Sequence, residues 1–136
     1  MTLRNLLVTA MVVGTGLTAG GVSEAKADDT TVYELRTYTA APGKMAELQK
    51  RFRDHTITIF EKHGMKSVGY WVSEKQPDTL IYILAHKSRK DADASWTAFR
   101  KDPEWRRVFA ESQKNGSLTT KVVSVYMTPT DFSPLK

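Results

Sequence analysis

The sequence has 136 residues and no cysteine, which excludes disulfides, thiolate metal ligands and a cysteine nucleophile. It also has no glycine-rich phosphate loop, no serine nucleophile elbow, and no pair of histidines or carboxylates at metal-ligand spacing. The formal net charge is +5, but basic residues alternate with acidic ones instead of forming a basic stripe with interleaved aromatic residues. We therefore expect no metal site, no cofactor and no nucleic-acid partner.

Long apolar runs are missing as well. The first apolar segment spans only residues 6–13, and glycine and threonine dilute the residues after it, so the segment is too short to span a membrane. Arg4 precedes it, and Ala25-Lys26-Ala27 comes after it in the small-x-small pattern of a signal-peptide cleavage site. We predict a cleavable signal peptide over residues 1–27, a single domain over residues 28–136, and an exported protein, periplasmic or secreted, without a stable membrane anchor.

The rest of the chain predicts alternating strands and helices. Two helical stretches are expected at residues 44–64 and 88–115, and the second restarts at Asp102, where an aspartate N-cap precedes a proline. Segments rich in β-branched and aromatic residues predict four strands, at residues 32–39, 67–74, 80–86 and 122–127. The order β-α-β-β-α-β predicts an α+β, ferredoxin-like domain with a four-stranded antiparallel sheet.

The strands are apolar on both faces, whereas two helical stretches can cover only one side of a sheet. The uncovered side must therefore meet something else, most economically a second copy of the same chain. This pattern predicts a homodimer formed through the sheet face. Alternation in the first strand separates Tyr33, Leu35 and Thr37 on one face from Glu34, Arg36 and Tyr38 on the other.

Five short motifs follow one another along the chain: Tyr33-Glu34-Leu35-Arg36-Thr37-Tyr38, Pro42-Gly43-Lys44, His63-Gly64, Gly69-Tyr70-Trp71 and Asp102-Pro103-Glu104-Trp105. In these motifs the chain resembles the NIPSNAP family. The resemblance implies a ferredoxin-like domain of the dimeric α/β-barrel group and a homodimer, and it implies no particular reaction. The chain departs from the family after Glu74, where Lys75-Gln76-Pro77-Asp78 replaces the usual glycine turn.

Arg36 is the first candidate site residue, because an arginine in mid-strand, on a sheet face taken to be covered by another subunit, must find a partner. Its functional interpretation is a clamp for a carboxylate or enolate in a cavity. Its structural interpretation, which we favour, is an ion pair with Glu34 or across the dimer. Trp71, Tyr38 and Tyr126 share the Arg36 face if the strand register allows it, and they suit either a ligand pocket or a dimer core.

Two histidines complete the candidate set. His55 is expected on the inner side of the first helix, as a buried neutral side chain or, less favoured, as a general base. His86 ends the third strand, either near the opening of a barrel or as an exposed residue before the next helix.

Three functions remain open from the sequence. The first is an exported homodimer that binds a small organic ligand, aromatic or carboxylated, in an aromatic-lined cavity. The second is a cofactor-independent oxygenase or isomerase in which Arg36 stabilises an anion and His55 or a tyrosine moves a proton. The third is a non-catalytic interaction module.

Overall fold

The computed structural model describes residues 30–136, so the predicted signal peptide at residues 1–27 lies outside the described part. Within that part, no helix has both the length and the apolar character that crossing a bilayer requires. The elements are, in order, β1 (Val32–Ala40), α1 (Met45–Arg51), the π-helical segment η1 (Phe52–Thr56), α2 (Ile57–Lys62), β2 (Lys66–Val72), β3 (Thr79–His86), α3 (Arg89–Lys101), α4 (Pro103–Ser112) and β4 (Thr119–Met127).

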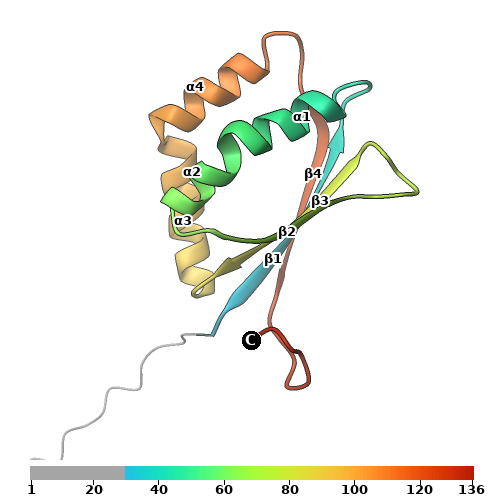
Figure 1. Ribbon diagram of the computed structural model, residues 1–136. Coiled ribbons are helices and arrows are strands. Elements are labelled where there is room, and N and C mark those ends of the chain that lie inside the picture. The colour runs from blue at the N-terminus through green and yellow to red at the C-terminus, as the bar shows by residue number, and fades with distance from the viewer. Residues whose placement is uncertain (1–29) are drawn as a thin grey trace, which may run out of the picture.

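The four strands form one sheet in the order β2-β3-β1-β4, with every neighbouring pair antiparallel. All the helices lie together on one side of this sheet (Figure 1). The arrangement confirms the predicted α+β, ferredoxin-like β-α-β-β-α-β fold. The turn at residues 73–78 closes the predicted hairpin between β2 and β3, with Thr79 N–H donating to the carbonyl of Gln76 at 2.8 Å.

Side chains alternate between the two faces along each strand, and the strand register aligns those of one face in cross-strand rows. One cross-strand row on the helix side runs Tyr70, Tyr82, Arg36 and Ser124 from β2 to β4. Against this side packs a core that includes fully buried side chains from every layer, namely Leu48, Ile59, Phe60, Met65, Tyr82, Leu84 and Leu118.

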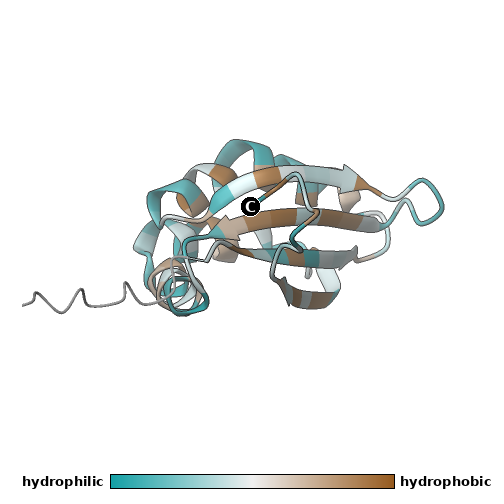
Figure 2. Ribbon diagram, turned by 90° about the horizontal axis from the view of Figure 1, so that it is seen from below, coloured by the Kyte–Doolittle hydropathy of each residue, from teal (hydrophilic) through white to brown (hydrophobic). Residues whose placement is uncertain are grey.

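The other side of the sheet, here called the open face, is apolar and is covered by no described helix (Figure 2). Two cross-strand rows define it, Trp71-Ile81-Thr37-Val123 and Gly69-Ile83-Leu35-Val125. Trp71 is 52% exposed and Val125 48%, which is unusual for large apolar side chains in adjacent rows. The fold thus leaves one side of the sheet uncovered by helices, as the sequence predicted.

The first helical stretch contains a π-helical segment that the sequence pattern did not predict. Within η1 the buried positions are Phe52 and Thr56, and the Thr56 hydroxyl donates to the carbonyl of Arg51 at 3.2 Å. The wider π turn puts Thr56 rather than His55 in the buried position. His55 is therefore half-buried and lines a cleft towards α4, so its predicted place on the inner side of the helix is wrong.

The second helical stretch bends where the sequence predicted. The Ser88 side chain caps α3 by accepting from the Asp91 N–H, and Asp102 caps α4 by accepting from the Glu104 N–H at 2.7 Å. Val108 lies on the inner side of α4. Phe109 does not, because it is 45% exposed.

Candidate functional site

The most polar part of the protein interior is a cluster around Glu34 on the helix side of β1. Glu34 is fully buried, and its carboxylate accepts hydrogen bonds from Arg36 Nη1 at 2.7 Å, His86 Nε2 at 2.9 Å, Trp96 Nε1 at 2.6 Å and Ser124 Oγ at 2.6 Å. Burial alone would raise the pKa of Glu34, but these four donors outweigh it and lower the pKa to about 2. The carboxylate is thus held ionised by its neighbours.

Arg36 is held by the same cluster, through one hydrogen bond from each of its three nitrogens. Its Nε donates to the Tyr82 hydroxyl at 2.9 Å, its Nη2 donates to the Tyr38 hydroxyl at 3.2 Å, and its guanidinium lies 4.3 Å from the ring centroid of Trp96. The structure therefore forms the Glu34 ion pair that the sequence favoured for Arg36. Arg36 also lies on the helix side, not on the open face where a second subunit was expected to cover it.

His86 is buried beside Glu34 and has one unpartnered ring nitrogen. Its Nε2 contacts Glu34, whereas its Nδ1 is buried without a hydrogen-bond partner among residues 30–136. Because the Glu34 carboxylate accepts in this contact, Nε2 is the donor, and Nδ1 is left without a partner in the described chain. His86 is therefore neither at an open cavity mouth nor exposed, as the two interpretations of the sequence had it.

The three aromatic candidates divide between the two sides of the sheet. Tyr38 and Tyr126 share the helix side with Arg36, and the Arg89 guanidinium lies 3.8 Å from the ring centroid of Tyr126. Trp71 lies on the open face. The set does not line one pocket.

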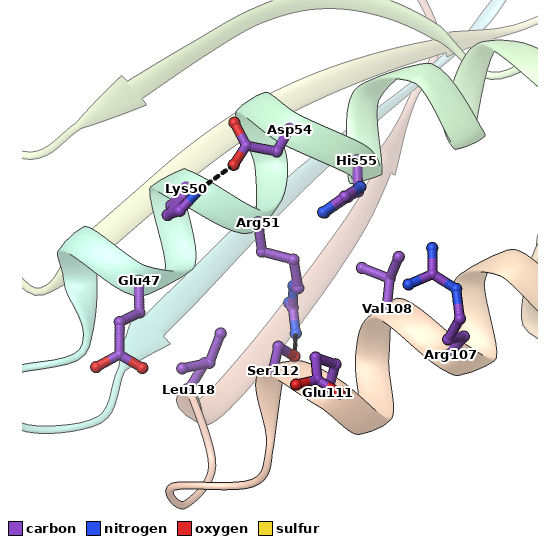
Figure 3. A pocket seen from close by; sticks show the side chains of 10 residues that line it. All are labelled: Glu47, Lys50, Arg51, Asp54, His55, Arg107, Val108, Glu111, Ser112 and Leu118. Carbon is purple, nitrogen blue, oxygen red and sulfur yellow. Dashed lines mark hydrogen bonds and ion pairs between the residues drawn. The ribbon is translucent and has the colours of Figure 1, made fainter.

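A cleft does exist between α1–η1 and α4, with a volume of about 230 Å³ (Figure 3). We call it the Arg51 cleft. His55 is the one predicted site residue that lines it. The complete lining is Glu47, Lys50, Arg51, Asp54, His55, Arg107, Val108, Glu111, Ser112 and Leu118.

Arg51 is the unusual residue of this cleft. It is 7% exposed, yet no carboxylate of the described chain forms an ion pair with it. Its Nη1 donates to Ser112 Oγ at 3.2 Å, while its Nε is buried and unpartnered within residues 30–136. Burial lowers the pKa of Arg51, and the nearby phenol oxygens of Tyr38 and Tyr82 offset only part of this effect.

Aromatic rings provide the remaining support for the Arg51 charge. Its guanidinium carbon lies 5.3 Å from the ring centroid of Trp105 and 5.6 Å from that of Phe109, both on α4. Contacts of this kind stabilise a cation by about 0.5–2 kcal/mol. Such energies are small beside the cost of burying a charge without a counter-ion.

Arg51 was not among the residues that the sequence pattern singled out, although a signal was present. Arg51 follows Leu48 by three positions, so a regular helix already places it on the buried stripe. A charged residue on that stripe marks a site to examine. Among the residues that the structure describes, no group of three or more histidines and carboxylates lies close enough to hold a metal ion.

Comparison with known proteins shows the family to which the chain belongs. The NIPSNAP family model matches residues 33–134. The chain belongs to the NIPSNAP family. A curated relative, the Protein NipSnap homolog of Dictyostelium discoideum, is 29% identical over 105 residues, which cover 75% of this chain and 46% of the relative. This NIPSNAP chain thus spans about half the length of that relative.

Solved structures agree with the family assignment. A NIPSNAP family protein with unknown function from Agrobacterium tumefaciens is 28% identical, with a TM-score of 0.70 over 79% of this chain and 96% of that one. A protein described as a putative antibiotic biosynthesis monooxygenase from Chloroflexus aurantiacus is 14% identical, with a TM-score of 0.53 over 79% of this chain and all of that one. At that identity the second likeness concerns the fold alone.

Proposed function

We propose that this NIPSNAP protein is an exported homodimer that binds a small organic ligand in the Arg51 cleft. The observation that carries ligand binding is the cleft itself, because a solvent-connected hollow with a buried, incompletely partnered side chain is typical of a binding site. The open face supports the homodimer. Export rests on the sequence of residues 1–27 and is tested by N-terminal sequencing of the mature protein, which should begin at Asp28.

A second copy is the favoured partner of the open face because the two rows that define the face are apolar and carry no charged residue. Its two rows contain six apolar side chains, one threonine and one glycine. Such a surface suits a like surface, and homodimer interfaces are the most apolar class of protein interface.

Catalysis of the oxygenase or isomerase type is the second candidate, favoured by the fold shared with the Chloroflexus protein. Such chemistry would need Arg36 to stabilise an anion, yet each of its three nitrogens already donates to a protein oxygen. Binding without turnover therefore agrees better with the geometry around Arg36.

A screen of thermal stability tests ligand binding. The purified protein is heated with a panel of small aromatic and carboxylated compounds, and a binder raises the melting temperature in proportion to the logarithm of its concentration once the site is nearly saturated. At least one class of compound should produce such a shift. A panel without any concentration-dependent shift would contradict the proposed function.

A further inference from the structure

We infer that the Arg51 cleft is an anion site for a small organic carboxylate, with Arg51 as its anchor and Arg107 and His55 at its rim. This inference rests on the proposed ligand binding and names the chemical class of the ligand. Arg51, which is buried, and Arg36, which is partly buried, differ in their partners. Arg36 has a carboxylate oxygen at 2.7 Å, whereas Arg51 has only a serine hydroxyl at 3.2 Å and aromatic faces.

The acidic side chains of the cleft do not neutralise Arg51. Each of them is engaged by a lysine on the surface: Glu47 by Lys44, Asp54 by Lys50 and Glu111 by Lys114. Arg107 lines the same cleft and forms no ion pair in the described chain. The cleft therefore keeps the positive charge of Arg51 and Arg107 unmatched, which favours an anionic occupant.

The donor geometry points to a carboxylate. Arg51 has an Nε–H without a partner in the described chain, its Nη1 is held in place by Ser112, and guanidinium groups bind planar carboxylates through paired donors. Figure 3 shows Arg51 reaching from α1 towards Ser112 on α4, with His55 and Arg107 at one end of the cleft. A carboxylate beside Arg51 thus has further cationic and polar groups within the same hollow.

The size and the apolar lining limit the rest of the ligand. The cleft, at about 230 Å³, is close to the lower end of the ~300–1,000 Å³ that small-molecule sites span. Val108 and Leu118 supply apolar walls. A single-ring or short-chain carboxylate matches a cleft of this size.

The test uses benzoate as the probe and benzamide, its uncharged near-isostere, as the control ligand. Binding to the purified, uniformly ¹⁵N-labelled protein is followed by titration in two-dimensional NMR, with a Kd in the roughly millimolar range expected for so small a probe. Benzoate should perturb amide signals of α1, η1 and α4. Benzamide should bind at least about tenfold more weakly, because it lacks the charge that Arg51 recognises.

Variants locate the site. Arg107→Glu should weaken benzoate binding roughly fivefold or more, whereas Arg106→Glu, at the adjacent exposed position that does not line the cleft, changes the net charge equally and should have little effect. Arg51→Gln should abolish measurable binding. Should Arg51→Gln fail to fold, the Arg107 and Arg106 pair and the benzamide comparison still decide the question.

The possible failures can be told apart. If the stability screen finds a ligand but benzoate leaves the cleft signals unchanged, the carboxylate class is wrong and the proposed ligand binding stands. Equal binding of benzoate and benzamide would likewise overturn the anion site, and so would equal effects of Arg107→Glu and Arg106→Glu. A merely structural Arg51 predicts a lower melting temperature for Arg51→Gln and no benzoate binding by the unaltered protein.

Discussion

At the scale of single residues, the buried charge of Glu34 holds several elements of the fold together. It is fully buried, and four side-chain donors from β1, β3, β4 and α3 converge on it. Because the carboxylate ties the sheet to α3, its ionisation is linked to folding. A folded-state pKa of about 2, against 4.5 for the free side chain, means that Glu34 stabilises the fold fully above about pH 5.

This linkage predicts acid sensitivity. The contribution of Glu34, about 3 kcal/mol, should be lost as the pH falls from about 5 to 2. Glu34→Gln should lower the free energy of unfolding at pH 7 by about 3 kcal/mol, since Arg36 loses its counter-ion, and should flatten the pH dependence. Urea denaturation at several pH values measures both effects. Glu47→Gln, at an exposed ion pair, should retain the slope of the unaltered protein, and an unchanged slope in Glu34→Gln would refute the linkage.

Gly69 and Trp71 lie next to each other on the open face. A Cβ added to Gly69 would lie 2.5 Å from Cη2 of Trp71, so the indole ring rests on the strand where glycine has no side chain. Gly69→Ala should therefore displace the Trp71 ring rather than unfold the protein, because that ring lies on the open face and not in the core between the sheet and the helices. The indole N–H signal of Trp71 should shift in NMR spectra while those of Trp96 and Trp105 stay in place. A cooperative loss of the fold would contradict this account.

At the scale of elements, Asp102 joins three helices. One of its carboxylate oxygens caps α4, and the other contacts Lys62 at 2.8 Å and His63 at 2.7 Å at the end of α2. The hydrogen bonds from Lys62 and His63 lower the pKa of Asp102 well below its ordinary value. Asp102 thus links the end of α2 to the start of α4.

The two roles of Asp102 predict an order of stabilities. Asp102→Asn retains an oxygen for the N-cap and loses the charge, whereas Asp102→Ala loses both. Melting temperatures should therefore fall in the order unaltered protein, Asp102→Asn, Asp102→Ala. Equal melting temperatures for the two variants would show that the cap at α4 contributes nothing.

Elements differ in how well the sequence predicts them. The caps at Ser88 and Asp102 were predictable because side-chain capping is local. The π turn of η1 was not, because it depends on burying Thr56 and Arg51 against other elements. Alternation in β1 separated the faces correctly, but it does not say which face the helices take. Arg36 was consequently placed on the wrong side, and the Arg51 cleft, which needs α1 and α4 together, was not foreseen.

At the scale of the whole molecule, a helix layer covers one side of the sheet and the open face remains apolar. Trp71, Val123 and Val125 are all substantially exposed there. Near the end of this face the Tyr33 hydroxyl donates to the carbonyl of Lys136 at 3.0 Å, so the C-terminal segment returns to the margin of the sheet. The open rows thus remain the apolar surface on which we propose that a second copy docks.

Sedimentation equilibrium at micromolar concentration tests this claim most directly, with two valines of the same strand as a matched pair. Val125, on the open face, and Val122, on the helix side, are 48% and 45% exposed. The unaltered protein and Val122→Glu should sediment as dimers, whereas Val125→Glu should weaken association about 100-fold or more, because it buries an unpaired charge in an apolar interface. A monomeric unaltered protein, or a Val125→Glu variant that dimerises as well as Val122→Glu, would contradict the account.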